Sequence, residues 1–475
     1  MALIGRTAER DIFNDCIQSQ ESRLIAVYGR RRVGKTFLIR NHFEKQIKFE
    51  ISGLHHGDMK DQLKQVFDVV SGYGLQKSAL TYPDSWMDAF KLIQSYIDSL
   101  KGTGKKVIFL DELPWFDTPK SKFLMAFENF WNTYCTKRND LIVVICGSAA
   151  SWMIKKIVKN KGGLHNRVAE KIRLNPFSLH ETELFLKDRF IKMSRYDILQ
   201  LYMVTGGVPF YLDRIRKGES FVQFVNRACF TENGFLRDEY NELLKSLFDN
   251  AKNHELVLKV MAKKSAGFTR NELADKTKLA SGGTLTEVID ELTESGFIKK
   301  YHPFGTIKTQ SLYKLTDHFV LFHHQFLNDN VRMGGNEWNL KANTSAWLSW
   351  AGLAYELICF NHIQQILNIL KLQAISCQIS PWRYESEQGG VQIDLIIDRA
   401  DRVLNLCEIK FSKADYVISK SEAMSLRNKI VALSNHPNSK KKVIFPTFIT
   451  THGLKNNEYA HELVQNQVTM NDLFL

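Results

Sequence analysis

One short stretch constrains this chain more than any other: residues 24–40, which read LIAVYGRRRVGKTFLIR. It opens with an apolar run typical of a buried strand and closes with residues that favour the start of a helix. Between the two, the spacing from Gly29 to Thr36 fits G-x-x-x-x-G-K-[ST] without departure. A glycine-rich turn leaves backbone N–H groups free to cradle phosphates, and the helix N-terminus adds partial positive charge. The stretch therefore predicts a strand, a phosphate-binding loop and a helix.

The side chains of this loop have separate predicted roles. Lys35 can reach the β- and γ-phosphates of a nucleotide, and the Thr36 hydroxyl can ligate Mg²⁺. The alternative is a plain turn between two core elements, but a chance match between a strand and a helix is rare. The residues expected to contact the nucleotide are Gly29, Arg30, Arg31, Arg32, Val33, Gly34, Lys35, Thr36 and Phe37.

A second signature follows downstream, at residues 107–112, where four apolar residues end in two acids. Such a run predicts a strand buried on both faces, as in a parallel sheet, and ligands bind at the carboxyl end of strands in an open α/β sheet. We expect Asp111 to hold Mg²⁺, directly or through water. Glu112 is the candidate general base that polarises the attacking water. The non-functional alternative is a solvated strand end, and the upstream phosphate loop argues against it.

Two further residues are candidates for the same site. Ser148 follows an apolar strand at residues 141–146, where a polar side chain usually lies between the two acids and the γ-phosphate. It is either such a sensor or an ordinary helix N-cap. Arg167 precedes another short strand, at residues 171–174. It either contacts the γ-phosphate, in cis or across a subunit boundary, or is a surface arginine.

Residues 206–209, Gly-Gly-Val-Pro, interrupt a helical region. Glycine and proline inside helices cost several kcal/mol of propensity, so a packing or ligand reason is expected. Pro209 either covers the adenine from the side of a helical lid or belongs to a plain helix–helix turn.

Farther along, the pattern changes to three short helices, at residues 255–263, 270–277 and 284–295, and two strands, near residues 296–298 and 312–315. This order is typical of a winged helix, whose third helix enters a DNA groove. That helix is acidic, however, and acids repel phosphates, so its partner is either DNA or protein. The acids are Glu287, Asp290, Glu291 and Glu294.

A polar stretch at residues 328–343 is predicted to be a linker, followed by a long helix over residues 347–370. Glu356 lies on the apolar face of that helix, which is costly unless the carboxylate has a partner.

Two strands, at residues 389–398 and 403–411, complete the C-terminal pattern. Glu408 and Lys410 point to the same side because strand side chains alternate, and Asp394 lies on the adjacent strand. Converging carboxylates bind Mg²⁺ through oxygen, and a lysine can stabilise developing charge or orient a water. We therefore predict metal ligands at Asp394, Glu408 and Glu356, with Lys410 catalytic. The non-functional alternative is a structural hairpin with cross-strand charge pairs.

Composition sets the cellular context. The chain has 475 residues, enough for about three domains, and a formal net charge of +13, which favours a polyanionic partner such as nucleic acid. The seven cysteines are scattered and contain no C-x-x-C pair, which indicates reduced thiols in the cytoplasm. The N-terminus becomes charged at once and no apolar run is long enough to span a bilayer, so we expect neither a signal peptide nor a membrane partner.

The segments GRRRVGKT, VIFLDELPW, CGSAASWM, GGLHNR and GGVPFYL, in this order, resemble archaeal-type P-loop ATPases of the AAA+ and STAND-like branch. The resemblance implies a nucleotide-switched ATPase core with a helical lid. The arrangement of Glu356, Asp394, Glu408 and Lys410 resembles the PD-(D/E)XK nuclease fold. Together with Trp350-Ala351-Gly352 and Gln392-Ile393-Asp394, it is similar to the nuclease-like domain that often ends archaeal-type ATPases.

The expected fold class is α/β. It comprises a P-loop NTPase parallel sheet (residues 1–180), a helical lid (181–250), an all-α winged helix (251–327) and a C-terminal α/β restriction-endonuclease-like domain (344–475). The expected cofactors are ATP and Mg²⁺ and the expected partner is DNA, with homo-oligomerisation left open. The expected function is Mg²⁺-dependent ATP hydrolysis that controls a DNA-acting nuclease-like domain. The alternatives are a nucleotide-driven switch that binds DNA or protein through an inactive nuclease fold, and an ATPase with a structural tail.

Overall fold

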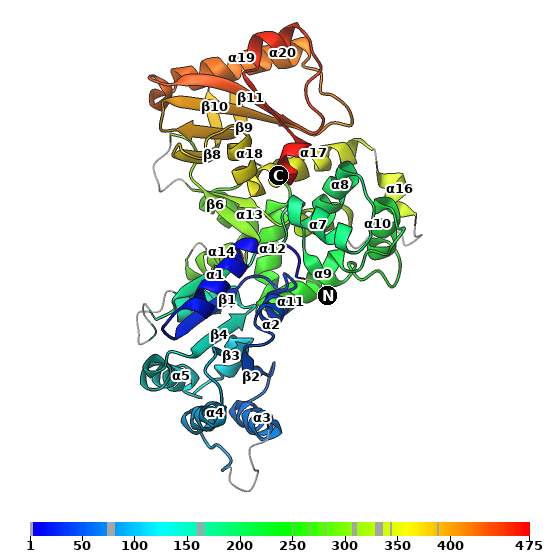
Figure 1. Ribbon diagram of the computed structural model, residues 1–475. Coiled ribbons are helices and arrows are strands. Elements are labelled where there is room, and N and C mark those ends of the chain that lie inside the picture. Colours follow the sequence, from blue (N-terminus) through cyan, green and yellow to red (C-terminus); the bar gives the residue numbers. More distant parts are fainter. Residues whose placement is uncertain are drawn as a thin grey trace. The chain divides into compact units, whose positions relative to one another are not determined.

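The computed structural model describes residues 3–73, 81–158, 164, 167–248, 250–264, 266–280, 282–305, 311–327, 336–342, 344–386 and 389–475. They form two compact units, Met1–Asn175 and Pro176–Leu475, which are taken in turn (Figure 1).

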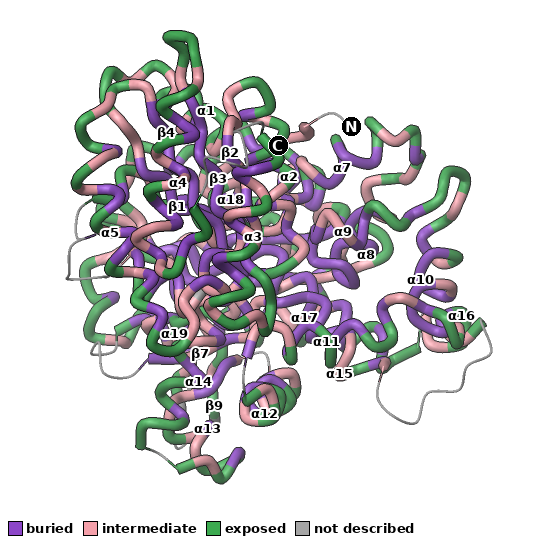
Figure 2. Tube along the Cα trace, turned by 90° about the horizontal axis from the view of Figure 1, so that it is seen from below, coloured by how far each residue is buried: buried purple, intermediate pink, exposed green. Residues whose placement is uncertain are grey.

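The first unit is built on a five-stranded sheet with the order β2-β3-β4-β1-β5, and every neighbouring pair is parallel. β3 and β4 are buried over their full length (Figure 2), because helices cover both faces of the sheet. This confirms the predicted α/β fold with a parallel sheet. The strands are β1 Arg23–Tyr28, β2 Ile47–Ser52, β3 Lys106–Asp111, β4 Leu141–Gly147 and β5 Glu170–Arg173.

Alternating side chains of the strands feed two separate cores. On one face of the sheet, Leu24 and Ile108 pack against aromatic side chains of the covering helices. On the other face, Ile25 and Phe109 pack with Phe13. The helices of this unit are α1 Thr7–Gln18, α2 Lys35–His42, α3 Met59–Gly72, α4 Trp86–Ser99, α5 Phe123–Thr133 and α6 Ala150–Met153, with shorter turns η2 Leu113–Phe116, η3 Cys135–Lys137 and η4 Ile154–Val158.

The second unit begins with five helices, where a helical lid is predicted. They are α7 Leu179–Asp188, α8 Arg195–Thr205, α9 Pro209–Leu212, α10 Phe221–Cys229 and α11 Glu239–Leu247. The interruption between α8 and α9 has a packing reason. Gly206 and Gly207 both have positive φ, and a Cβ on Gly207 would lie 2.2 Å from the carbonyl oxygen of Phe177.

Three helices and an antiparallel hairpin follow: α12 Ala251–Met261, α13 Arg270–Thr277, α14 Gly283–Glu294, β6 Ile298–Tyr301 and β7 Leu312–Leu315. α13 opens with a capping box of Thr269 and Glu272, which confirms the sequence prediction. The hairpin means that this segment is not all-α. α15 His318–Phe326 comes next.

Two predictions for the following segment are wrong. Part of the expected linker forms α16 Glu337–Lys341, because Trp338 is buried and its ring packs against Phe230 and Phe322. The expected long helix is divided into α17 Ser345–Asn361 and α18 Ile363–Ile369. His362 lies at the break, and its ring accepts the backbone N–H of Leu179 at 2.9 Å.

The chain ends in a second five-stranded sheet with the order β12-β11-β10-β9-β8. β8, β9 and β10 are antiparallel neighbours, while β11 is parallel to β10 and to β12. α19 connects β10 to β11, as a parallel crossover requires, and its buried face shares a core with β9 and β10. The elements are β8 Cys377–Ser386, β9 Gly389–Arg399, β10 Val403–Lys410, α19 Lys420–Asn435, η5 Pro437–Ser439, β11 Val443–Thr450, α20 Glu458–Leu463, β12 Asn466–Thr469 and η6 Met470–Phe474.

None of the helices in the described ranges combines the length and the apolar character that a membrane span requires.

Candidate functional site

The loop between β1 and α2 depends on two glycines. Gly29 has φ 145°, and a Cβ there would lie 2.4 Å from the carbonyl oxygen of Leu174. Gly34 has φ 90° and is the N-cap of α2, which begins at Lys35. The loop thus ends at a helix N-terminus, where backbone N–H groups lack partners within the helix and favour a negatively charged ligand.

Lys35 folds back into this loop and is buried. Its ammonium group donates to the carbonyl oxygens of Gly29 and Arg30, both at 3.0 Å. The positive charge is therefore held inside the concave side of the loop, which is the position expected of a phosphate-binding lysine.

Thr36 and Asp111, predicted to share a metal ion, lie next to each other. The Thr36 hydroxyl donates to Asp111 Oδ2 at 3.0 Å, so the start of α2 meets the end of β3. Burial raises the pKa of Asp111, and the Glu112 carboxylate raises it further, while the hydrogen bond from Thr36 lowers it. A hydroxyl and a carboxylate fit Mg²⁺, which uses few protein oxygens and retains several waters.

Glu112 and Ser148 are also brought together, because β4 is the neighbour of β3. The Ser148 hydroxyl donates to the Glu112 carboxylate at 2.8 Å and its backbone N–H does so at 3.0 Å. Glu112 itself has φ 47°, in the left-handed region. The carboxylate expected to polarise water is thus fixed by a residue at the next strand end.

The other predicted residues lie as follows. Arg30 and Val33 are buried, Arg32 is half-buried, and Arg31 and Phe37 are exposed. Arg167 is exposed in a turn before β5, and most of the segment before it lies outside the described residues. Pro209 occupies the first turn of α9 in the second unit. The roles of Arg167 and Pro209 at the nucleotide stay predictions.

Sequence reasoning missed His55, which follows β2 at the same sheet edge. Its ring lies 4.8 Å from that of Trp115, between centroids. Burial lowers the pKa of His55, nearby His56 and Arg31 lower it further, and Glu112 opposes them. Only its position in the loop that follows β2 could have identified it.

In the second unit, the four predicted residues of the C-terminal site gather around β9 and β10. Glu408 and Lys410 lie on the same side of β10, with Lys410 Nζ 3.4 Å from Glu408 Oε2. Asp394 on β9 accepts the backbone N–H of Ile409 through Oδ2 at 3.1 Å. Glu356 belongs to α17, which packs on β10.

The electrostatics show that these groups act on one another. Burial raises the pKa of Glu356 to about 7, with Asp394 contributing and Lys314 and Lys410 opposing. Burial and Asp394 also raise the pKa of Glu408. Burial lowers the pKa of Lys410, but the carboxylates of Glu408 and Asp394 outweigh it and the net pKa is raised. We call Glu356, Asp394, Glu408 and Lys410 the carboxylate cluster.

Two lysines near this cluster were missed. Lys429 on α19 forms an ion pair with Glu408. Lys314 on β7 is buried and feels the attraction of Glu356 and then Asp394, although burial lowers its pKa. Nothing local in the sequence marks either lysine, since both reach the cluster only through tertiary packing.

Within the described ranges, no group of three or more His, Cys, Asp or Glu side chains is arranged to hold a metal ion. The carboxylate cluster is therefore not a ready-made cage of three protein ligands. Mg²⁺ binds through one or two carboxylates together with water and phosphate oxygens, and the neighbouring carboxylates Asp394 and Glu408 fit that smaller requirement.

Comparison with known proteins finds similarity over the N-terminal part of the chain and, at low identity, over most of it. Residues 4–215 match a model described as an ATPase domain predominantly from Archaea. An uncharacterized protein of Methanocaldococcus jannaschii is 22% identical over 414 residues, which cover 86% of this chain and 87% of the relative.

Three solved structures are similar at low identity. The Walker-type ATPase of Pyrococcus abyssi has a TM-score of 0.49 and 16% identity, covering 68% of this chain and 96% of that one. The ORC2 protein of Aeropyrum pernix has a TM-score of 0.40 and 14% identity, covering 67% and 92%. A STAND protein with a tetratricopeptide repeat sensor from Pyrococcus horikoshii has a TM-score of 0.31 and 17% identity, covering 78% and 51%. Residues 4–215 are thus similar to an ATPase domain of the type found predominantly in Archaea.

Proposed function

We propose that this chain binds ATP together with Mg²⁺ and hydrolyses it at the loop between β1 and α2. The observation that carries the proposal is the meeting of three features at one sheet edge. They are the inward-facing ammonium of Lys35, the pair Thr36 and Asp111, and the pair Glu112 and Ser148.

Each residue has a defined task in this reaction. Lys35 exchanges its two carbonyl partners for oxygens of the β- and γ-phosphates, and Thr36 and Asp111 hold Mg²⁺. When bound, Mg²⁺ supplies positive charge against the phosphates. Glu112 orients the attacking water and accepts its proton, while Ser148 keeps the Glu112 carboxylate in place.

Lys35→Ala tests this proposal directly. Loss of a charge-assisted contact with phosphate should weaken ATP binding at least about tenfold, measured by isothermal titration calorimetry. The exposed Lys45 of the same unit gives the matched control, Lys45→Ala, which should bind as wild type does. Equal affinity of Lys35→Ala and wild type would show that the loop does not bind the triphosphate.

We further propose that the carboxylate cluster is a divalent-cation-dependent site for phosphodiester cleavage in DNA, controlled by the nucleotide state of the ATPase domain. Two observations support this second proposal. The side chains of Glu356, Asp394 and Glu408 interact with one another and with Lys410. The sheet that carries them is mixed, with a parallel crossover through α19. Asp394 and Glu408 would hold Mg²⁺, which polarises a phosphoryl oxygen when bound. Lys410 orients the attacking water or balances developing charge.

Nicking of supercoiled DNA with Mg²⁺, in the presence of ATP, ADP or no nucleotide, tests the second site. Asp394→Asn and Lys410→Ala should abolish nicking, whereas Asp401→Asn, in the exposed turn after β9, should not. A wild-type chain that cuts neither DNA nor RNA under any of these conditions lacks the proposed activity.

A rival function has its own support. Glu408 is paired with both Lys410 and Lys429, so its charge is already balanced by protein groups. That suits a degenerate nuclease fold used for binding, in a nucleotide-driven switch. Salt-dependent DNA binding without cleavage would favour it.

We propose that the segment from α12 to β7 is a winged helix that faces protein rather than DNA. Glu287 and Asp290 are exposed on its third helix, α14, where they would repel phosphates. Its hairpin also packs on the C-terminal sheet: Phe304 joins the core that contains Trp382 and Ile393.

A further inference from the structure

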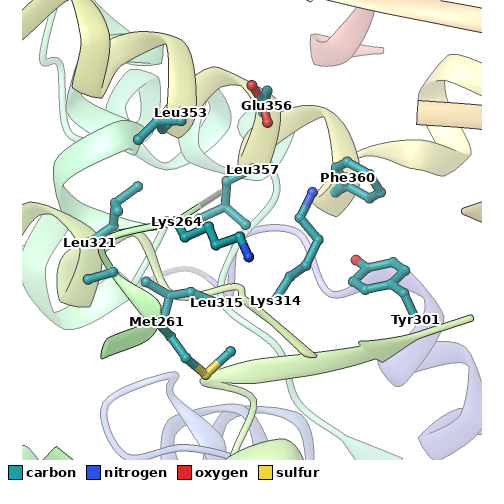
Figure 3. A pocket seen from close by; sticks show the side chains of 11 residues that line it. Met261, Lys264, Tyr301, Lys314, Leu315, Leu321, Leu353, Glu356, Leu357 and Phe360 are labelled. Carbon is teal, nitrogen blue, oxygen red and sulfur yellow. The ribbon is translucent and has the colours of Figure 1, made fainter. Parts of the chain in front are cut away.

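The hairpin β6–β7 carries a lysine into the surroundings of the carboxylate cluster. Lys314 on β7 pairs with Lys299 on β6, yet Lys299 is exposed and Lys314 is only 9% exposed. The Lys314 ammonium lies 4.2 Å from the ring centre of Phe360, one turn beyond Glu356 on α17. Figure 3 shows Lys314 rising from the hairpin toward the helix that carries both residues, and Lys314 and Glu356 line one small cavity.

A buried ammonium is costly unless negative charge lies near it. For Lys314, burial has the largest effect and lowers the pKa, whereas the negative charge of Glu356 and then of Asp394 opposes burial and Arg383 adds to it. The remaining carboxylate, Glu408, is met by its own two lysines. Three acidic side chains thus lie near three lysines, and of these lysines Lys314 comes from outside the C-terminal sheet and its helices.

The position of Lys314 follows from how the hairpin docks. Tyr301 of β6 packs edge-on against Phe360, with ring centroids 5.3 Å apart. The backbone carbonyl after β7, at Thr316, accepts a hydrogen bond from Asn361 at the end of α17, at 3.3 Å. A shift of the hairpin would therefore withdraw the ammonium from the cluster.

We propose that Lys314 is the intramolecular counter-ion of the Glu356 and Asp394 carboxylates, and that it competes with a divalent cation for the carboxylate cluster. The inference rests on the cation site proposed above and adds its regulation. Like charges repel strongly where water is scarce, so a cation near Asp394 gains affinity when the Lys314 charge is removed or withdrawn.

Mn²⁺ binding to the full chain tests this competition. Calorimetric titration without nucleotide is made in a Thr36→Ala, Asp111→Ala background, so that neither side chain of this pair supplies an oxygen for the cation. Lys314→Gln should bind Mn²⁺ about tenfold more tightly than the background protein, or better. Lys314→Arg, which keeps the charge, and Lys299→Gln, the exposed partner in register, should both leave the affinity unchanged.

Thermal unfolding gives a readout independent of affinity. Lys314→Gln should melt at a lower temperature without metal, because Glu356 loses its counter-ion, and Mn²⁺ should restore the melting temperature. Lys299→Gln should show neither effect. If Lys314→Gln does not fold, the same substitution is made with Glu356→Gln, which removes both charges, and should again tighten Mn²⁺ binding relative to Glu356→Gln alone.

The outcomes separate the two proposals. If Asp394→Asn abolishes Mn²⁺ binding but Lys314→Gln binds no more tightly than the background protein, the competition is overturned and the cation site stands. If Asp394→Asn leaves Mn²⁺ binding unchanged, the cation site does not exist and both proposals fail.

Discussion

Ser148 donates both its hydroxyl and its backbone N–H to the carboxylate of Glu112, at 2.8 and 3.0 Å. Ser148→Ala removes the hydroxyl contact and retains the backbone contact. A hydrogen bond to a charged group contributes roughly 1.5–3 kcal/mol, so we expect kcat for ATP hydrolysis to fall about tenfold or more while the Kd for ATP stays unchanged. Steady-state turnover and calorimetric binding, measured side by side, check this.

Glu112→Gln is the reference for that experiment, since it should bind ATP but hydrolyse it about 100-fold more slowly. Faster turnover in Ser148→Ala would show that Ser148 holds the carboxylate away from the attacking water, the opposite of the role assigned to it.

The contact between Thr36 and Asp111 predicts a change in metal dependence. Thr36→Ala removes one of the two oxygens expected to hold Mg²⁺, so the Mg²⁺ concentration for half-maximal ATP hydrolysis should rise about tenfold. Thr36→Ser keeps the hydroxyl and is the matched control. Titration of ATPase activity with Mg²⁺ distinguishes them, and an unchanged midpoint in Thr36→Ala would exclude the residue as a ligand.

The geometry of the loop and of the strand ends in the first unit was predictable because its determinants are local. The phosphate loop is fixed by Gly29 and Gly34, whose positive φ few other residues adopt, and Asp111 ends a continuous apolar strand. Parallel strands in one sheet then place such strand ends along one edge. The contact of Ser148 with Glu112 needed only that β3 and β4 be neighbours.

The features that the sequence did not predict depend on packing between segments that are far apart in the chain. Lys429 and Lys314 reach the carboxylate cluster from a crossover helix and from a separate hairpin, and neither is marked in its own sequence context. Trp338 lies among polar residues that suggest a linker, yet its ring is buried by aromatic side chains from α10 and α15. The local sequence pattern around a residue does not show which distant segments its side chain contacts in the folded chain.

Gly207 should be far less replaceable than another glycine with similar backbone geometry. Gly207 and Gly218 have φ 69° and 80°, but an added Cβ meets backbone and ring atoms at Gly207 and nothing within 4 Å at Gly218. Gly218→Ala should therefore lower the free energy of unfolding by about 1 kcal/mol, through backbone strain alone. Gly207→Ala should cost about 3 kcal/mol or more, because the Phe177 carbonyl must move. Urea denaturation measures both, and equal losses would contradict the assigned packing role.

The second unit should lose stability as the pH falls, because it buries neutral histidines. Burial lowers the pKa of His318 to about 3, of His324 to about 3 and of His362 to about 4. The unfolded chain binds protons at these groups from about pH 6.5 downward, whereas the folded chain does not. Their contribution to the free energy of unfolding is therefore complete above that pH. Below it, the free energy of unfolding falls by about 1.4 kcal/mol per histidine for each pH unit.

His318→Phe tests the acid sensitivity at one position. The buried Nδ1 of His318 has no hydrogen-bond partner within the described ranges, and Nε2 has a long 3.5 Å contact with Asn361 Nδ2. The ring lies edge-on to Tyr202 at 5.3 Å, so a phenyl ring keeps this packing and loses one weak contact. The variant should be at least as stable as wild type at pH 7.5 and should lose less stability by pH 5, since one titrating group is removed. The exposed His461, replaced by Gln, should leave the pH dependence unchanged. Urea midpoints at pH 7.5, 6 and 5 decide the matter: if His318→Phe loses as much stability toward acid as wild type, His318 is not a source of the acid sensitivity.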